Sequence, residues 1–207
     1  MQKIYRRGVK MNKIKILISA VITLTASVMY SSTALAEWAL DADNSNISYG
    51  TIKNGSIGES NTFGTISGTI SDNGHINIDI DLASVSTQLE LRDERMRDIV
   101  FKVTENATAK LTGDMSLQAH NDQEIGTSRV IEATIGLELV GEKVDHDVML
   151  VVTRLGENKV MVTPHGVMFV DAYDYELLEA IDTLRELAGL ETIETVVPMS
   201  FYLTFTK

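Results

Sequence analysis

Cysteine is absent from the 207 residues of this sequence, and proline occurs only twice. Without cysteine the protein can form no disulfide, no thiolate metal site, no covalent link to haem and no lipid link through an N-terminal cysteine. Its fold must therefore be stabilised by a hydrophobic core alone, whatever the redox conditions of its compartment.

Positive charge is also scarce. The sequence has 18 lysine and arginine residues against 29 aspartate and glutamate residues, and its formal net charge is −11. A chain with this charge repels the phosphates of nucleic acids and anionic membrane surfaces. The composition therefore argues against nucleic acid as a partner.

Recognised catalytic and metal-binding patterns are missing as well. The sequence contains no G-x-S-x-G, no H-E-x-x-H and no glycine-rich phosphate loop. We therefore predict a protein that is not an enzyme and that carries no cofactor and no metal.

The segment Asp145-His146-Asp147 has residue types that can bind a metal. Neighbouring side chains of a strand would, however, point to opposite faces. We expect a solvated turn or a sheet edge there rather than a metal site.

The N-terminus has the pattern of a secretory signal peptide. A basic segment is followed by an apolar run over residues 16–29 and then by Ala34-Leu35-Ala36. Cleavage after Ala36 would leave one domain, residues 37–207, with a net charge of −17, because the leader holds six basic residues and no acidic one. Met11 is an alternative start, and an uncleaved membrane anchor is the competing interpretation.

Most of the remaining chain alternates apolar and polar residues with a period of two. The clearest segments are 76–82, 109–119, 131–139 and 199–205. This period is typical of a strand with one buried and one solvated face. Turn signals fall at 72–74, 121–122, 141–143 and 156–158, so we predict antiparallel hairpins.

Other strand candidates are less regular. Segments 47–52 and 63–70 are rich in glycine and threonine, and segments 160–163 and 167–170 are short. Residues 148–152 form a continuous apolar run, which predicts a strand covered on both faces. Several small residues fall on the predicted inner faces, and we expect them to leave room in the interior: Gly64, Gly68, Ala109, Gly113, Ala119 and Ala133.

Two segments break the strand pattern and predict helices. Residues 88–100 predict a short charged helix, and residues 174–190 a longer one with Asp174 as N-cap and Gly189 as its end. In the second, an apolar face holds Leu177, Ile181, Leu184 and Ala188. This face could lie over a barrel mouth as a lid or simply cover exposed core.

Many antiparallel strands with one apolar face each must pack as two sheets or close on themselves. An eight-stranded closure has an interior that is either filled by side chains or able to hold one ligand. The alternation alone predicts an all-β fold and leaves both arrangements open.

Several stretches resemble one known family in their residues and in their order. They are Trp38-Ala39-Leu40-Asp41, Ser45-Asn46-Ile47-Ser48-Tyr49, residues 63–70, Val85-Ser86-Thr87 with Arg92-Asp93-Glu94-Arg95-Met96-Arg97 and Phe101, Ala107-Thr108-Ala109, and residues 136–141 followed by Val148. Together they resemble the YceI-like family. The most specific part is the combination of two motifs. A V-x-T segment is followed by R-D-x-x-hydrophobic-R, and a G-x-L-x-hydrophobic-x-G hairpin lies downstream. The resemblance covers residues 38–207.

The resemblance implies an eight-stranded antiparallel barrel similar to lipocalins, with two short helices and a long apolar tunnel. Family members are secreted or periplasmic and hold polyprenyl chains or isoprenoid quinones. We therefore expect a periplasmic binding protein for a polyprenyl phosphate or an isoprenoid quinone, in transport, storage or stress response, with a homodimer as an open option. The residues expected to line the tunnel are Ile47, Tyr49, Phe63, Ile78, Ile80, Leu111, Met115, Ile135, Leu137 and Phe201.

Three arginines cluster in the segment 92–97 of this acidic chain. Arg92 and Arg95 are the candidates for the polar end of the ligand, because guanidinium pairs well with phosphate. The alternative is pairing with neighbouring carboxylates, or a structural link between the helix and the barrel. Two further functional interpretations stay open: an interaction protein with a filled core, and a barrel hydrolase or isomerase that uses a carboxylate or histidine.

Overall fold

The computed structural model describes residues 37–115 and 122–207. The predicted signal peptide lies outside the described residues, and so do Leu117, Ala119 and His120.

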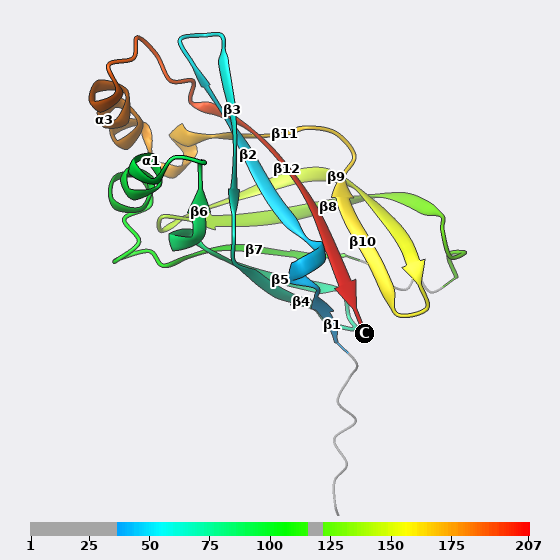
Figure 1. Ribbon diagram of the computed structural model, residues 1–207. Helices are drawn as coiled ribbons and strands as arrows, with labels where there is room; N and C mark the ends of the chain where they lie inside the picture. Colours follow the sequence, from blue (N-terminus) through cyan, green and yellow to red (C-terminus); the bar gives the residue numbers. More distant parts are fainter. Residues whose placement is uncertain (1–36, 116–121) are drawn as a thin grey trace, which may run out of the picture. The chain divides into compact units, whose positions relative to one another are not determined.

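Twelve strands in the described residues form one antiparallel sheet (Figure 1). They are β1 (Trp38–Leu40), β2 (Asn46–Lys53), β3 (Ile57–Phe63), β4 (Ile66–Ile70), β5 (His75–Asp81), β6 (Val85–Ser86), β7 (Thr108–Asp114), β8 (Ser128–Leu139), β9 (Glu142–Gly156), β10 (Lys159–Pro164), β11 (Met168–Asp171) and β12 (Val196–Thr206). Within the described residues, each predicted alternating segment lies on a strand, apart from Leu82 and Met115 just beyond the ends of β5 and β7.

The twelve segments make eight long strands of a closed barrel. β1 continues into β2, β3 into β4, β5 into β6 and β10 into β11, each pair being one strand interrupted by a bend or a short turn. Closure occurs at β1, where Ala39 pairs with Thr206 of β12 on one side and with Thr69 of β4 on the other. The prediction of an eight-stranded antiparallel barrel is confirmed.

Alternation decides which side chains enter the barrel. On β5, Ile76, Ile78 and Ile80 are buried, whereas Asn77 between them is exposed. The expectation that residues 148–152 are covered on both faces is wrong. Leu150 points inward and is buried, but Met149 is 45% exposed, because the wall is a single sheet and this stretch has one interior side only.

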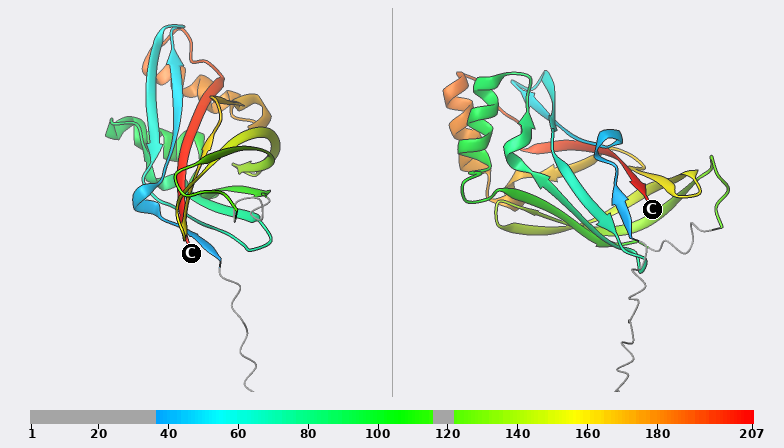
Figure 2. Two further views of the ribbon diagram at one scale, coloured as in Figure 1. Left: turned by 90° about the vertical axis from the view of Figure 1, so that its right-hand side faces the viewer. Right: turned by 60° about the horizontal axis from the view of Figure 1, so that its bottom comes forward.

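The two helices lie side by side at one end of the barrel, which we call the helical end (Figure 2). α1 (Glu90–Arg95) runs directly into a π-helical turn, η3 (Met96–Val100), so the predicted segment 88–100 is helical from its third residue. None of the helices in the described residues combines the length and apolar character needed to cross a bilayer.

α3 (Leu178–Ala188) begins later than predicted, and Asp174 is not its N-cap. The Asp171 carboxylate instead accepts a hydrogen bond from the backbone N–H of Tyr173 at 3.0 Å and starts a short 3-10 turn, η4 (Ala172–Tyr175). Glu176 then adopts a left-handed conformation, with φ of 55°, which ends that turn. Gly189 closes α3 with φ of 63°, as predicted.

Candidate ligand-binding cavity

An apolar cavity of about 270 Å³ occupies the helical end of the barrel. Its wall combines barrel residues with the inner faces of α1, η3 and α3. All four residues of the predicted apolar face of the 174–190 segment line it: Leu177, Ile181, Leu184 and Ala188. This segment therefore covers the cavity, which is the lid interpretation, rather than the outer side of the barrel.

A second void, of about 40 Å³, lies further along the barrel interior. It is less than a sixth as large as the first cavity. Leu137, Val170 and Met199 line both spaces and lie between them. We call the two spaces the upper cavity and the lower void.

Inward-facing glycines at the lower void do not leave room, contrary to the expectation. A Cβ atom at Gly68 would lie 2.8 Å from the Cα atom of Ile78, and one at Gly113 would lie 2.8 Å from the Cδ1 atom of Ile135. These glycines let neighbouring strands and side chains approach closely. The lower part of the barrel is therefore close to a filled core.

The residues predicted to line a tunnel divide between the two spaces. Ile47, Tyr49, Phe63, Ile80 and Leu137 line the upper cavity, and Ile78, Leu111, Met115, Ile135, Leu137 and Phe201 line the lower void. Arg92 and Arg95 both line the upper cavity. The structure thus places all twelve on the interior, while their contact with a ligand stays a prediction.

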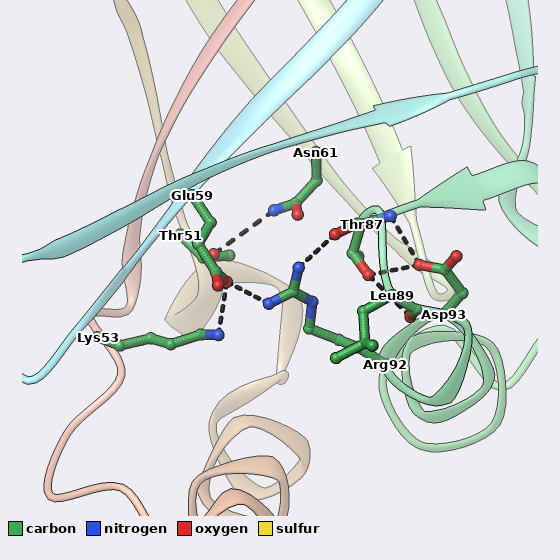
Figure 3. Close-up of polar contacts among 8 residues, drawn as sticks. All are labelled: Thr51, Lys53, Glu59, Asn61, Thr87, Leu89, Arg92 and Asp93. Atoms are coloured by element: carbon green, nitrogen blue, oxygen red, sulfur yellow. Dashed lines mark hydrogen bonds and ion pairs between the residues drawn. The ribbon is translucent and has the colours of Figure 1, made fainter.

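Arg92 connects α1 to the barrel wall at the edge of the upper cavity (Figure 3). Its two terminal nitrogens donate to the Glu59 carboxylate on β3 and to the Thr87 carbonyl. Lys53 on β2 lies 2.5 Å from the same Glu59 oxygen. Burial would raise the pKa of Glu59, but hydrogen bonds and charges from Arg92 and Lys53 outweigh it and hold this pKa below its ordinary value. Glu59 is therefore ionised at neutral pH.

Asp93, the next residue, faces the other way and fixes the loop before α1. Its buried carboxylate accepts hydrogen bonds from the backbone N–H of Thr87 at 2.6 Å and from the Thr87 hydroxyl at 2.5 Å. This bracing holds Gln88 in a left-handed conformation, with φ of 65°. The Val-x-Thr and Arg-Asp pieces of the sequence thus form one unit that presents Arg92 to the cavity.

Three buried polar atoms of the upper cavity have no hydrogen-bond partner among the described residues. They are the Tyr49 hydroxyl, the Asn61 side-chain oxygen and Nε of Arg92. Asn61 is only 2% exposed, and its amide nitrogen donates to the Thr51 hydroxyl at 3.5 Å (Figure 3). An unsatisfied buried polar atom costs about 1–3 kcal/mol, so three in one wall indicate a place for a bound polar group.

Tyr49 is neutral at this site. Burial raises its pKa above the ordinary value of 10, and the nearby charge of Arg92 only partly opposes that rise. Its ring contacts Phe63 with a centroid distance of 5.6 Å, and Phe63 contacts Phe101 at 5.9 Å. The phenol is therefore held in place by aromatic packing and can both donate and accept a hydrogen bond.

The three clustered arginines have three different environments. Arg92 forms the structural link described above, and Arg97 pairs with Glu90 on the helix surface at 3.1 Å. Arg95 lines the upper cavity, and none of the ion pairs found among the described residues involves it. Arg92 thus fits the interpretation of a structural link, and Arg97 fits that of pairing with a neighbouring carboxylate.

Four polar residues of this site were missed by the sequence analysis: Lys53, Glu59, Asn61 and Thr87. β3 reads IGESNTF, which has no clear alternation, so no local signal separated the inward-facing Asn61 from its neighbours. Glu59 is recognised only through its contact with Arg92, which is 33 residues away in the chain. Thr87 belongs to a stretch that was recognised, but its role was not predicted.

His146 was expected in a solvated turn or at a sheet edge, and that expectation is wrong. It lies within β9 and points into the barrel, where its Nε2 atom is 2.8 Å from the Tyr175 hydroxyl. Asp145 and Asp147 are exposed, so the side chains diverge as the strand geometry requires. Among the described residues, no group of three or more histidine or acidic side chains could hold a metal ion.

Comparison with known proteins gives a consistent result. A model of the YceI-like domain matches residues 38–205. A solved polyisoprenoid-binding domain from Saccharophagus degradans, described as implicated in plant cell wall breakdown, is 33% identical, with a TM-score of 0.80 over 82% of this chain and 97% of its own. No curated protein sequence matches this chain.

A more distant solved structure shares the fold. BcnA from Burkholderia cenocepacia is 15% identical and superimposes with a TM-score of 0.62, over 80% of this chain and 98% of its own. At this identity the likeness concerns the barrel architecture alone. The architecture described above is therefore found in proteins that differ widely in sequence.

Proposed function

This chain belongs to the YceI-like family, and on that basis we propose that it is a carrier that holds an isoprenoid lipid in its upper cavity. In this proposal the tail lies against the apolar wall, and an oxygen-bearing head group contacts Tyr49, Asn61 and Arg92. The observation that carries it is the meeting of three unpaired buried polar atoms in the wall of one apolar cavity.

The apolar wall supports a hydrocarbon ligand. Transfer of apolar surface out of water stabilises a complex by about 25 cal/mol per Å² and needs no directional chemistry. The Saccharophagus degradans relative is described as polyisoprenoid-binding, which supports a tail of this class. A protein with an entirely filled core would not have a space of about 270 Å³ at one end.

The polar groups favour an uncharged head group. Arg92 and Lys53 are both already ion-paired to the Glu59 carboxylate. The phenol hydroxyl and the N–H left over can donate to a carbonyl or hydroxyl oxygen, whereas the amide oxygen can only accept, from a hydroxyl. Together they suit a carbonyl- or hydroxyl-bearing head group rather than a pyrophosphate. Of the two expected ligands, an isoprenoid quinone therefore fits this wall better than a polyprenyl phosphate.

Arg95 is the observation that favours the polyprenyl phosphate. It lines the upper cavity and enters no ion pair with the described residues, so it could meet a phosphate. The rest of the proposal carries the sequence-based expectations forward. It comprises export through the signal peptide to the periplasm, binding without catalysis, and a role in transport, storage or stress response.

Native mass spectrometry tests the proposal directly. The whole chain is expressed in a bacterial host that exports it and is purified without detergent, and any adduct is identified by fragmentation after solvent extraction. We expect a stoichiometric isoprenoid adduct, with a protein mass that corresponds to cleavage after Ala36. The same spectra report whether the protein is a monomer or a dimer.

Protein without an adduct is then incubated with an isoprenoid quinone and, separately, with a polyprenyl phosphate. Binding of the quinone alone supports the neutral head group, and binding of the phosphate alone moves the polar end to Arg95. Failure to bind either one would contradict a lipid carrier and favour an interaction protein.

A further inference from the structure

A hydrogen-bonded pair, His146 and Tyr175, connects the barrel wall to the segment that carries α3. His146 faces inward from β9, opposite Ile135 of β8. Its Nε2 atom lies 2.8 Å from the Tyr175 hydroxyl, and the two rings are stacked with centroids 6.5 Å apart and planes at 17°. Neither the head-group site nor the core packing described above accounts for this pair.

The pair lies between the two interior spaces. Tyr175 lines the upper cavity, whereas His146 lines the lower void. The hydrogen bond therefore crosses the wall that separates them. A molecule that extended from the upper cavity into the lower void would have to pass this contact or the neighbouring apolar residues that line both spaces.

Tyr175 is held firmly on its own side of the wall. The η4 turn that carries it is started by the Asp171 carboxylate, and the N–H of Ala172 donates to the Thr195 carbonyl at 3.0 Å. The N–H of Leu177 in turn donates to the Ala172 carbonyl at 3.0 Å, just before α3. Burial raises the pKa of Tyr175 to about 12, with a smaller contribution from Asp174, so the phenol is neutral.

The volumes show why such a partition matters. The upper cavity, at about 270 Å³, lies just below the range of about 300–1,000 Å³ that is usual for pockets that bury a small molecule. It can hold a head group and a short tail. A long isoprenoid tail needs more space than this. Beyond the pair lies the lower void, of only about 40 Å³, so a tail that continues in that direction must displace the pair and the apolar side chains around the void.

We propose that the His146–Tyr175 pair is a partition that sets the length of the tail the barrel accepts. With the hydrogen bond intact, a short tail fills the upper cavity. In this proposal a longer tail enters the lower void by separating the pair rather than by displacing the neighbouring apolar residues, so its binding is weakened by the loss of that contact. This inference rests on the proposed function, because it concerns the tail of the same ligand.

The expected effect follows from the value of one hydrogen bond. Removing the bond by substitution removes the penalty that a long tail would meet, and a hydrogen bond of ordinary strength corresponds to about a 2- to 10-fold change in affinity. Tyr175→Phe keeps the ring and removes only the hydroxyl. His146→Leu removes the partner from the other side. The matched control is Tyr173→Phe, in the same turn, because Tyr173 is 69% exposed.

The experiment compares two probes that carry one quinone ring, with tails of two and of eight isoprene units. Each is presented in phosphatidylcholine vesicles to the purified whole chain, and the dissociation constants are measured after transfer to the protein. We expect both Tyr175→Phe and His146→Leu to raise the affinity for the long tail relative to the short tail by about 2- to 10-fold. Tyr173→Phe should leave the ratio unchanged.

Thermal melts establish that each variant is folded. If both variants bind the probes with the wild-type ratio, the partition is overturned while the carrier function stands. If the wild-type protein binds neither probe, the proposed function fails, and this inference fails with it.

Discussion

The two halves of the barrel interior are built from the same strands and have different contents. At the helical end, the wall encloses about 270 Å³ and contains three polar atoms without partners among the described residues. Towards the other end, the space shrinks to about 40 Å³ and its surroundings are almost wholly apolar. β5 runs through both halves and supplies Ile80 to the first and Ile78 to the second.

The difference comes from the segments that leave the strand pattern. The helical end is covered by the helices (Figure 2), and residues of α1, η3 and α3 line the upper cavity. In the other half, glycines such as Gly68 let adjacent strands approach until the interior is filled. The alternation of apolar and polar residues thus determines which side chains face the interior. The helical segments between strands determine where that interior contains a cavity.

The largest effect that would test this comparison is the matched pair Ile78→Ala and Ile80→Ala. Both residues are buried, and they are two positions apart on one face of β5. In a filled region, loss of the isoleucine side chain costs about 2–5 kcal/mol. We expect Ile78→Ala to fall within that range and Ile80→Ala at its lower end, about 2 kcal/mol, because Ile80 already borders empty space. Urea titration of both variants measures the difference.

Ligand retention should show the reverse order. Ile80→Ala removes part of the wall that holds the tail, so its complex should dissociate faster than that of Ile78→Ala. If Ile78→Ala and Ile80→Ala lose stability equally and release the ligand equally fast, the two halves of the barrel interior do not differ as described.

A smaller effect is expected at the ion cluster that occurs only at the helical end. Glu59→Gln leaves Lys53 and Arg92 without their shared anion, at side chains that are 17–28% exposed. Partial solvent access reduces the cost of a broken buried pair, so we expect a loss of about 1–3 kcal/mol in unfolding free energy. Glu94→Gln, on the exposed side of α1, is the control and should change little.

The same variant separates the two candidate head groups. Neutralising Glu59 leaves the positive charges of Arg92 and Lys53 uncompensated, so a polyprenyl phosphate should bind more tightly and a quinone should not. Tighter binding of the quinone alone would contradict this expectation.

Acid should remove the contribution of Glu59 gradually. Because the folded-state pKa of Glu59 lies below its ordinary value of 4.5, ionised Glu59 stabilises the folded state at pH values above 4.5. That contribution is lost as the pH falls from about 4.5 through the lowered folded-state value. Wild-type and Glu59→Gln stabilities, measured from pH 7 down to pH 3, should therefore converge in acid. A constant difference across this range would show that the carboxylate charge contributes nothing.

The fold was predictable because strand alternation and turn residues are local signals. Ile76, Ile78 and Ile80 are buried as their spacing predicts, and the resemblance to a known family supplied the closure into a barrel. The start of α3 was missed because the capping carboxylate is Asp171, not Asp174, and it caps the 3-10 turn η4. α3 begins only after Leu177, which makes no side-chain capping hydrogen bond. Local sequence offers both carboxylates, and the choice between them depends on how β11 places the turn.

The candidate site was predictable only in part. Inward-facing apolar residues and the arginine cluster were found from pattern and resemblance. Glu59, Asn61 and His146 were not, because their roles arise from partners 10–33 residues away in the chain: Thr51 for Asn61, Tyr175 for His146 and Arg92 for Glu59. Division of the lining residues between a cavity and a filled core also depends on the helices that cover one end.

The smallest expected effect on stability, and the only gain in stability among these predictions, concerns the Tyr49 hydroxyl. Tyr49→Phe removes a buried hydroxyl that has no partner among the described residues and keeps the ring against Phe63. Since an unsatisfied buried hydroxyl is unfavourable, the ligand-free protein should gain up to about 1 kcal/mol of stability while its affinity for an oxygen-bearing isoprenoid falls several-fold. Tyr202→Phe, at a residue of β12 that is 47% exposed, is the matched control and should change neither quantity. A loss of stability in Tyr49→Phe would show that the hydroxyl has a partner in the ligand-free state. The helical end would then hold fewer unpaired polar atoms and would differ less from the filled half of the barrel.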